Sequence, residues 1–120
     1  MEKELITAEN TNRVWNDKNC IAYEYFFESE NTSLAIIEIK ERYPENCIAR
    51  NKFFEEIILV LEGNGKIIIE GEKYKVGRND AVLIKPNRKY YYEGNLKIAT
   101  FCSPAFDPNN HEVITGERKN

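Results

Sequence analysis

The chain contains 120 residues with a net charge of −3; 42% of them are hydrophobic and 31% are charged. That length supports one hydrophobic core but not two, and the hydrophobic content excludes wholesale disorder. Lysine and arginine are interspersed with aspartate and glutamate, which argues against the broad basic surface of a nucleic-acid-binding protein.

The cellular compartment can be predicted from the start of the chain and from the cysteines. Residues 1–5 contain no apolar run, so neither a signal peptide nor a membrane span is expected. Cys20, Cys47 and Cys102 are an odd number of cysteines at unrelated spacings. We therefore expect free thiols and a cytoplasmic location.

Strand-forming residues dominate the chain from residue 20 onward. Residues 1–19 are mostly polar, with Val14 and Trp15 as a bulky apolar pair, and we expect an arm that packs Trp15 on the domain or on a second subunit. Short runs of strand formers follow, separated by turn-forming residues, at 20–27, 34–40, 57–61, 66–70, 73–76, 81–84, 90–92 and 96–102. No window shows helical periodicity, so the pattern predicts an all-β sandwich or barrel.

The turns indicate a chain of short antiparallel hairpins. Asn64-Gly65 ends an apolar run and predicts a type I′ turn, and Gly71-Glu72 predicts a second turn. Residues 77–80 predict a third turn, and Asn87 suits a corner with positive φ. The tail after Pro104 is expected to lie on the surface.

Two segments together resemble the signatures of the cupin family. The first is Glu55 to Gly65, an apolar strand ending in Glu-Gly-x-Gly. The second runs from Gly77 through Asp80 to Pro86, and residues 103–108 are similar to the close of many small cupins. The resemblance implies a cupin-type double-stranded β-helix, a small jelly-roll barrel at 20–107, with an N-terminal arm at 1–19 and a C-terminal tail at 108–120.

The same resemblance locates a pocket but not the family's usual metal ion. That ion is held by three histidines and a glutamate, whose positions here would be Arg50, Lys52, Glu56 and Tyr90. Arginine offers no lone pair and protonated lysine repels a cation, so no metal and no other cofactor is expected. Metal-dependent dioxygenase chemistry is not expected either.

Arg50 and Lys52 lie two residues apart and would share one face of a strand. If that face is the barrel interior, they form a binding site for a carboxylate or phosphate. Alternatively, one of them pairs with Glu56 and fills the place of the metal, or both point to solvent. Glu56 could act as a general base if burial raised its pKa, but two neighbouring cations would lower it.

Tyrosines form the other candidate site residues. Tyr90 and Tyr92 share one side of a strand and could bind a sugar hydroxyl, or Tyr90 could act as a general acid; equally, the rings could supply core volume. Cys102 is expected to be a buried structural thiol. His111 is expected to be a solvated tail residue unless the tail folds over a barrel mouth.

Two functions follow from these residues. The first is a metal-independent binding protein for a small anionic or sugar-like metabolite, with Arg50, Lys52 and Tyr92 as ligand-binding residues and Tyr90 as an orienting donor. The alternative is a sugar isomerase, epimerase or lyase in which Glu56 or Tyr90 transfers the proton. A homodimer joined through outer strands is expected, since dimers bury the spare edges of small barrels.

Overall fold

The structure is a computed structural model that describes residues 4–114. Its strands are β1 (Asn12–Asp17), β2 (Cys20–Tyr25), β3 (Ser33–Ile39), β4 (Arg42–Tyr43), β5 (Ile48–Asn51), β6 (Glu55–Ile69), β7 (Glu72–Val76), β8 (Ala81–Ile84), β9 (Lys89–Ser103) and β10 (His111–Ile114). Two short 3-10 helices, η1 (Ala8–Asn10) and η2 (Pro108–Asn110), precede β1 and β10. Neither helix is long and apolar enough to cross a membrane.

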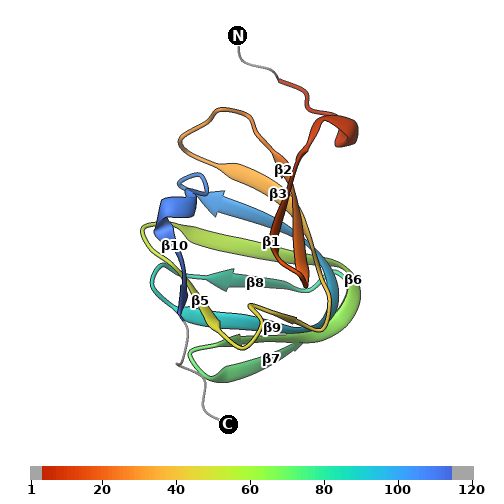
Figure 1. The fold of residues 1–120 in the computed structure, drawn as a ribbon, viewed down its shortest axis with the longest axis vertical. Helices are drawn as coiled ribbons and strands as arrows, with labels where there is room; N and C mark the ends of the chain where they lie inside the picture. Colours follow the sequence, from red (N-terminus) through yellow and green to blue (C-terminus); the bar gives the residue numbers. More distant parts are fainter. Residues whose placement is uncertain (1–3, 115–120) are drawn as a thin grey trace.

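The strands pair antiparallel in a curled sheet that closes into a barrel (Figure 1). One path of hydrogen-bonded neighbours runs β1-β2-β3-β9-β5-β10, while β6 pairs with β7, β8 and β9. Strand β4 also pairs with β9. The predicted all-β barrel is confirmed.

The long strands β6 and β9 differ from the prediction. The expected hairpin at Asn64-Gly65 is wrong, because β6 continues through it to Ile69. The expected break between residues 92 and 96 is also absent, because β9 is continuous. The two strands pair along almost their whole length, with Asn64 opposite Asn95 and Gly65 opposite Gly94.

Close backbone approach explains why glycine occurs at this pairing. A Cβ atom on Gly65 would lie 2.3 Å from the backbone oxygen of Glu93, and one on Gly94 would lie 2.7 Å from that of Asn64. Gly63 has a φ of 95°, and a Cβ atom there would lie 2.1 Å from the Asn95 oxygen. These glycines therefore let β6 and β9 bend together around the barrel, and they form no turn.

The other predicted corners are present. Residues Glu70 and Gly71 both have positive φ in the turn between β6 and β7. The backbone N–H of Gly77 donates to the Asp80 carboxylate in the turn before β8. Asn87 has a φ of 69°, as expected for the corner before β9.

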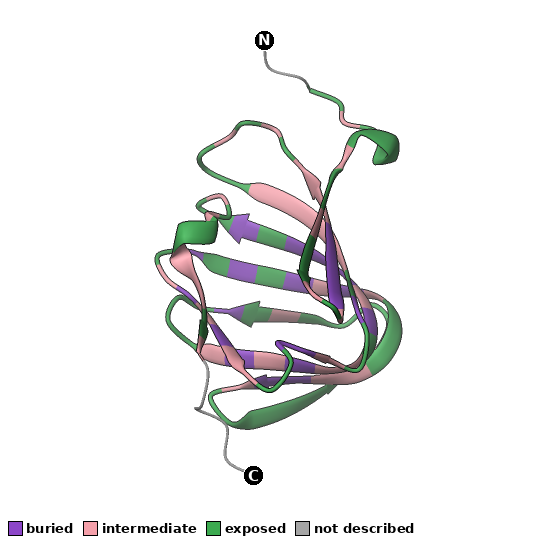
Figure 2. Ribbon diagram, in the orientation of Figure 1, coloured by how far each residue is buried: buried purple, intermediate pink, exposed green. Residues whose placement is uncertain are grey.

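Side chains alternate between the barrel interior and its outside. Buried and exposed residues follow one another along β6, β8 and β9 (Figure 2). The buried cluster comprises Cys20, Ile39, Tyr43, Ala49, Ile58, Val60, Ile67, Val76, Ile84, Tyr90, Tyr92, Leu96 and Ile98. Three tyrosines in this cluster introduce hydroxyl groups into an otherwise apolar interior.

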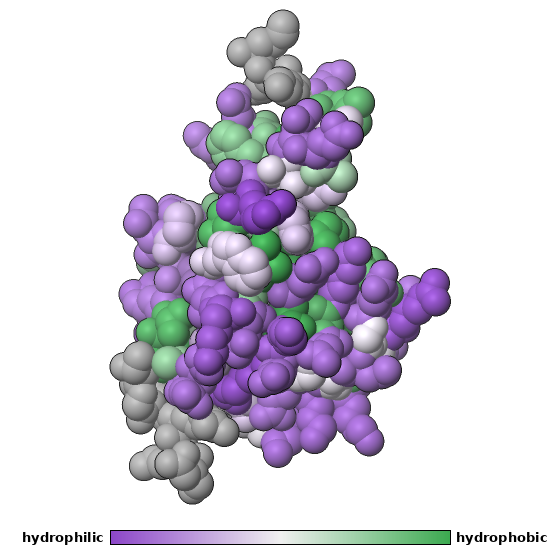
Figure 3. Space-filling model, turned by 45° about the vertical axis from the view of Figure 1, so that its right-hand side comes forward, coloured by the Kyte–Doolittle hydropathy of each residue, from purple (hydrophilic) through white to green (hydrophobic). Residues whose placement is uncertain are grey.

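Both end segments contribute strands to the sheet. The expected arm supplies β1, which pairs with β2, and Trp15 on it is 61% exposed rather than packed on the domain. The expected tail supplies β10, which pairs with β5. Residues 1–3 and 115–120 lie outside the described residues. The segment that contains η1 and the loop between β2 and β3 extend above the barrel (Figure 1), and apolar side chains gather beneath the N-terminal segment (Figure 3).

Candidate functional site

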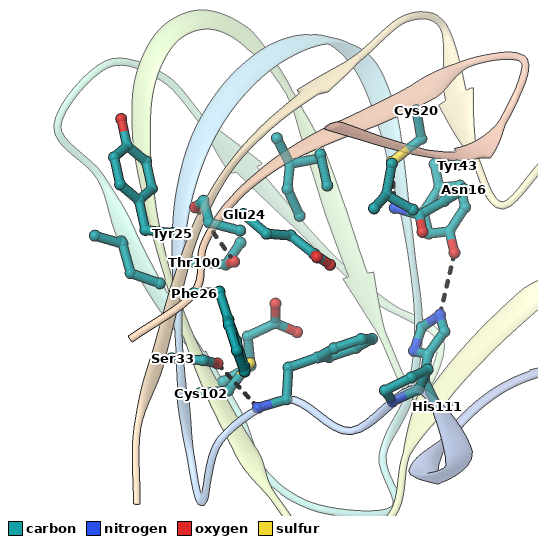
Figure 4. Close-up of a pocket in the computed structure, with 18 of the residues that line it drawn as sticks. Asn16, Cys20, Glu24, Tyr25, Phe26, Ser33, Tyr43, Thr100, Cys102 and His111 are labelled. Carbon is teal, nitrogen blue, oxygen red and sulfur yellow. Dashed lines mark hydrogen bonds between the residues drawn. The ribbon is translucent and has the colours of Figure 1, made fainter. Parts of the chain in front are cut away.

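A cavity of about 430 Å³ lies inside the barrel, within the size range of small-molecule sites. Its wall includes side chains from β1 to β3, the inner faces of β6 and β9, and the segment that contains η2 and His111 (Figure 4). Much of this wall is apolar, from Val14, Ala22, Ile37 and Phe106 among others. The polar groups are concentrated on a few side chains.

Glu56 is the buried carboxylate of the cavity wall. It lies on β6 opposite Ile84 of β8 and Cys102 of β9, and only 6% of its surface is exposed. Burial raises the pKa of Glu56 to about 7, although a hydrogen bond from Asn51 acts in the opposite direction. The expected lowering by neighbouring cations is therefore wrong, and Glu56 has a pKa suited to proton transfer at neutral pH.

A hydrogen-bonded network connects Glu56 to the C-terminal strand. The amide nitrogen Nδ2 of Asn51 donates to Oε1 of Glu56 at 3.0 Å. Asn51 Oδ1 lies 2.7 Å from Nδ1 of His111, and the hydroxyl of Tyr90 donates to the same oxygen at 3.3 Å. Nε2 of His111 in turn lies 3.1 Å from the hydroxyl of Tyr43, across the cavity in Figure 4. Sequence reasoning missed Asn51 and Tyr43 entirely.

His111 is therefore not a solvated tail residue. It begins β10 opposite Asn51 of β5, lines the cavity and stacks beside Tyr43 with ring centroids 6.5 Å apart. Burial lowers its pKa, which favours the neutral imidazole. Only the return of the tail onto β5 reveals this placement.

Tyr90 and Tyr92 both line the cavity, as their shared strand face predicted. Their rings meet edge to face with centroids 5.6 Å apart, and Tyr92 also stacks with Tyr43. Burial raises the pKa of both phenols well above the ordinary value. The hydroxyls therefore stay protonated and act as hydrogen-bond donors at neutral pH.

Arg50 and Lys52 do not line the cavity, so the predicted cationic clamp inside the barrel is wrong in its placement. Arg50 Nη2 lies 2.6 Å from Oε1 of Glu112, and Lys52 Nζ lies 2.8 Å from Oε2 of the same carboxylate. About a third of each side chain is exposed. The two cations hold β10 against β5 on the outer side of the sheet.

A shift of one residue explains this difference. The buried residues of β5 are Ala49 and Asn51, whereas Arg50 between them is partly exposed. In a strand, a shift of one residue moves every side chain to the opposite face. The free-energy cost of burial could have identified the correct register. Burying Ala49 and Asn51 inside a barrel costs less free energy than burying the cations Arg50 and Lys52.

Two cysteines also line the cavity, Cys20 from β2 and Cys102 from β9. Burial raises the pKa of the Cys20 thiol to about 12 and also raises that of Cys102. Both groups are therefore thiols rather than nucleophilic thiolates at neutral pH. Cys102 is buried, as predicted.

The side chains in the cavity do not suit a divalent metal ion. Within residues 4–114, no group of three or more His, Cys, Asp and Glu side chains is arranged to hold one. Ala49 and Asn51 are the residues of β5 that face inward in place of Arg50 and Lys52. The Ala49 side chain has no atom that could bind a metal, and Asn51 Oδ1 already accepts hydrogen bonds from two side chains. The Glu56 carboxylate is bound by the Asn51 amide.

Comparisons with known sequences place part of this barrel in a family. Residues 54–99 match the model of the cupin domain. An uncharacterised protein of Methanocaldococcus jannaschii is 33% identical over 60 residues, 48% of this chain and 47% of the relative. The match thus spans about half the length of that curated relative.

Solved structures share the whole architecture at low sequence identity. A variant of Streptomyces PAC13 with uridine has a TM-score of 0.86 at 18% identity, covering 96% of this chain and 93% of its own. Pac13, described as a nucleoside dehydratase, has a TM-score of 0.85 at 18% identity over 94% and 92% of the two chains. KdgF from Halomonas sp. has a TM-score of 0.72 at 12% identity over 89% and 98%.

These likenesses concern the fold, and the cupin-domain match covers the segment that carries Glu56, Tyr90 and Tyr92. The antiparallel barrel, its interior cavity and the matched signature agree with one another. Residues 54–99 therefore match the cupin domain, and the barrel as a whole has the cupin fold.

Proposed function

We propose that this cupin is a metal-independent proton-transfer enzyme of the isomerase, epimerase or lyase type, acting on a small neutral, sugar-like metabolite. The position and pKa of Glu56 carry the proposal. A carboxylate buried in a cavity wall with a pKa of about 7 can both accept and return a proton at neutral pH.

The charge of the cavity favours a neutral substrate over an anion. Two carboxylates, Glu24 and Glu56, contribute to its wall, and no lysine or arginine of the described chain does. An anionic ligand would face these carboxylates without a compensating cation. The anionic metabolite expected from Arg50 and Lys52 is therefore replaced here by a neutral one.

The polar and apolar parts of the wall suit a sugar or a nucleoside. Tyr43, Tyr90, Tyr92 and Thr100 provide hydroxyl groups, and Phe106 provides a flat apolar surface. Sugars combine hydroxyl groups with apolar ring faces, and a nucleoside adds an aromatic base. The similar structure of Streptomyces PAC13 with uridine supports this class of ligand.

The reaction requires only a base and hydrogen-bond donors. Glu56 removes a proton from a carbon next to a carbonyl group, and the electron pair moves to the carbonyl oxygen. A tyrosine hydroxyl, with Tyr92 as the candidate, donates a hydrogen bond to that oxygen. Return of the proton to the former carbonyl carbon, with transfer of the neighbouring hydroxyl proton to the enolate oxygen, completes an isomerisation. Replacement of the proton on the opposite face of the same carbon completes an epimerisation. Alternatively, the electron pair of the enolate expels a β-hydroxyl group, which takes the proton from Glu56 and leaves as water.

The assignment of metal independence rests on the donor groups of the cavity. The residues at the family's ligand positions either lack donors or are engaged with other protein groups. We expect purified protein to contain no stoichiometric Mn, Fe, Ni or Zn by elemental analysis. A molar equivalent of one of these metals would contradict the proposal.

The cellular compartment and the oligomeric state are part of the same proposal. Three free cysteines suit a reducing cytoplasm. A homodimer would cover apolar side chains that are exposed on the outer strands. The partner in solution is thus a second copy together with the small-molecule substrate.

Deuterium exchange tests the reaction without requiring that the product be identified first. The protein is incubated in D₂O with neutral aldoses, ketoses and nucleosides that carry a carbonyl group on the sugar, and carbon-bound deuterium is measured by NMR and mass spectrometry. We expect exchange with at least one compound, and a loss of about 100-fold or more in Glu56→Gln. Full exchange in that variant would exclude Glu56 as the proton carrier.

The neighbouring residue provides a matched control. Glu55 lies on the same strand but is exposed, so Glu55→Gln removes an equal charge outside the cavity. We expect this variant to retain exchange. Binding without exchange, with uridine as one of the compounds titrated, would indicate a binding protein instead of an enzyme.

A further inference from the structure

Strand β10 presents neighbouring side chains to opposite sides of the sheet. Glu112 points outward, where Arg50 and Lys52 hold both of its carboxylate oxygens. His111 points inward, where it meets Asn51 and Tyr43. The outer ion pairs and the inner hydrogen bonds thus fix the same strand from its two faces.

The hydrogen bonds of the inner network have a defined direction. An ionised Glu56 carboxylate can only accept, so the Asn51 amide turns its NH₂ group toward it. Asn51 Oδ1 then faces the opposite way and can only accept, which requires the hydrogen on Nδ1 of His111. In the neutral ring, Nε2 carries the lone pair and accepts from the hydroxyl of Tyr43.

We propose that His111, held as the neutral Nδ1–H tautomer, is a positioning residue that fixes the Asn51 amide with its NH₂ group toward Glu56. The inference rests on the proposed role of Glu56 as the base. A flipped amide would present an oxygen to the Glu56 carboxylate and oppose its ionisation. His111 thereby determines whether the base is available at neutral pH, although it does not touch the substrate in this role.

The surroundings of Glu56 contain few other groups that could set its protonation. The titratable side chains that interact with it are Cys20 from β2, Tyr43 from β4, and Tyr90, Tyr92 and Cys102 from β9. Burial raises the pKa of each of them, so all five remain neutral around pH 7. The Asn51 amide is thus the polar contact of the Glu56 carboxylate that can change, since it can present either its NH₂ group or its oxygen.

The tautomer can be observed directly, because the chain has one histidine. In tag-free protein labelled with ¹⁵N-histidine, every imidazole signal belongs to His111. We expect a protonated Nδ1 and an unprotonated Nε2 at pH 7. An Nε2–H tautomer or a charged ring at that pH would overturn the proposal, whatever substrate the protein uses.

Two substitutions of His111 distinguish a hydrogen-bond donor at Nδ1 from a side chain that only fills space. Asparagine can place an amide nitrogen close to the position of Nδ1, whereas glutamine places its nitrogen near Nε2. We expect His111→Asn to keep the hydrogen bond to Asn51 and His111→Gln to lose it. Val113→Ala is the matched control, since Val113 lies on the same strand outside the cavity.

The readout is the pH midpoint at which Glu56 titrates in the folded protein. For each variant, it is obtained from the pH dependence of the difference in unfolding free energy between that variant and the same variant carrying Glu56→Gln. We expect His111→Gln to raise that midpoint by about one pH unit, and His111→Asn and Val113→Ala to leave it unchanged. Equal midpoints in all three variants would overturn the role of His111 and leave the proposed role of Glu56 intact. A wild-type curve identical to that of Glu56→Gln would instead contradict the proposed function.

Discussion

At the scale of single residues, Asn51 is the side chain on which the candidate site depends. It is 2% exposed, and its amide is bonded on both sides, to Glu56 through nitrogen and to Tyr90 and His111 through oxygen. A buried amide with partners on both sides holds its neighbours in fixed orientations. The geometry around Glu56 is therefore set by an uncharged residue.

Replacing Glu56 tests the cost of burying its carboxylate. The pKa of Glu56 rises from 4.5 to about 7 on folding, so the folded state favours the protonated form. Stability from this group is full below the unfolded pKa and is lost as pH rises through about 7, with a total loss of about 3 kcal/mol. We expect Glu56→Gln to lack this loss in denaturant unfolding measured from pH 4 to 8.

Comparing wild-type protein with Glu56→Gln at each pH separates the contribution of Glu56 to stability from that of His111. The lowered pKa of His111 acts in the opposite direction, because its contribution to stability declines as pH falls below 6.5. That contribution is shared by both proteins and cancels in the difference. A difference independent of pH would show that Glu56 has an ordinary pKa.

The cysteines provide a second test at this scale. Cys20 and Cys102 are buried with raised pKa values, whereas Cys47 is only half-buried. We expect iodoacetamide at pH 8 to modify Cys47 first in the native protein, because alkylation requires an accessible thiolate. Peptide mass spectrometry measures the order of modification, with urea-unfolded protein as the control. Rapid modification of Cys102 would contradict its placement.

At the scale of elements, β6 and β9 bend together where glycines occur on both strands. Gly65 has no positive φ, so its role is steric, whereas Gly71 has a φ of 82° and no atom within 4 Å of the point where a Cβ would stand. We expect Gly65→Ala to cost at least about 2 kcal/mol of unfolding free energy, because the Glu93 backbone cannot move aside. Gly71→Ala should cost about 1 kcal/mol from its backbone conformation alone.

Denaturant unfolding measures both variants under identical conditions. The Gly71→Ala variant controls for the general effect of replacing a glycine in this sheet. A Gly65→Ala variant as stable as Gly71→Ala would show that β6 and β9 approach each other less closely than the structure indicates.

Strand β10 depends on a different kind of interaction. Glu112 binds both Lys52 and Arg50, and these hydrogen bonds lower its pKa. We expect Glu112→Gln to speed amide hydrogen exchange in β5 and β10, since the outer side of their pairing is weakened. Acidification through the lowered pKa of Glu112 should reduce the protection factors of the same amides in wild-type protein.

An ion pair outside β5 and β10 provides the control for Glu112→Gln. Lys18 and Glu45 form a pair at 3.1 Å, and neither residue belongs to β5 or β10. Glu45→Gln should leave exchange in β5 and β10 unchanged. An identical pattern in the two variants would show that the Glu112 pairs do not hold the strand.

At the scale of the whole molecule, the outer face of the sheet carries apolar side chains in register. Ile57 of β6 lies opposite Leu83 of β8 and opposite Phe101 of β9, and each is between 41% and 46% exposed. Neighbouring exposed apolar residues on one sheet face are typical of contact surfaces between proteins. Because β6 lies between β8 and β9, these residues form a face of the sheet, and a homodimer contact here would join two faces where the prediction joined strand edges.

Replacing the central residue of this face tests the dimer. We expect wild-type protein to sediment as a dimer at micromolar concentration and Ile57→Lys to shift it toward the monomer, because the charge would be buried at the interface. Tyr74→Lys is the control, since Tyr74 is exposed on β7, away from the three residues. A monomeric wild type would contradict the predicted homodimer.

The sequence by itself determined the class of fold and the position of most of its strands. Alternating strand formers, the turns at Gly71 and Asn87 and the matched signature depend on local residue preferences and on a pattern within one segment. The regular alternation of faces also predicted that Tyr90 and Tyr92 share one side of a strand, and both line the cavity together with Glu56.

Only the tertiary structure decided what these residues do together. The register of the short strand β5, the exclusion of Arg50 and Lys52 from the cavity, and the return of His111 to Asn51 depend on contacts between segments about 60 residues apart in sequence. Burial in the closed barrel, not local charge, then sets the pKa of Glu56. Local patterns specify strands, but the desolvation of a side chain and its partners exist only after the barrel has closed.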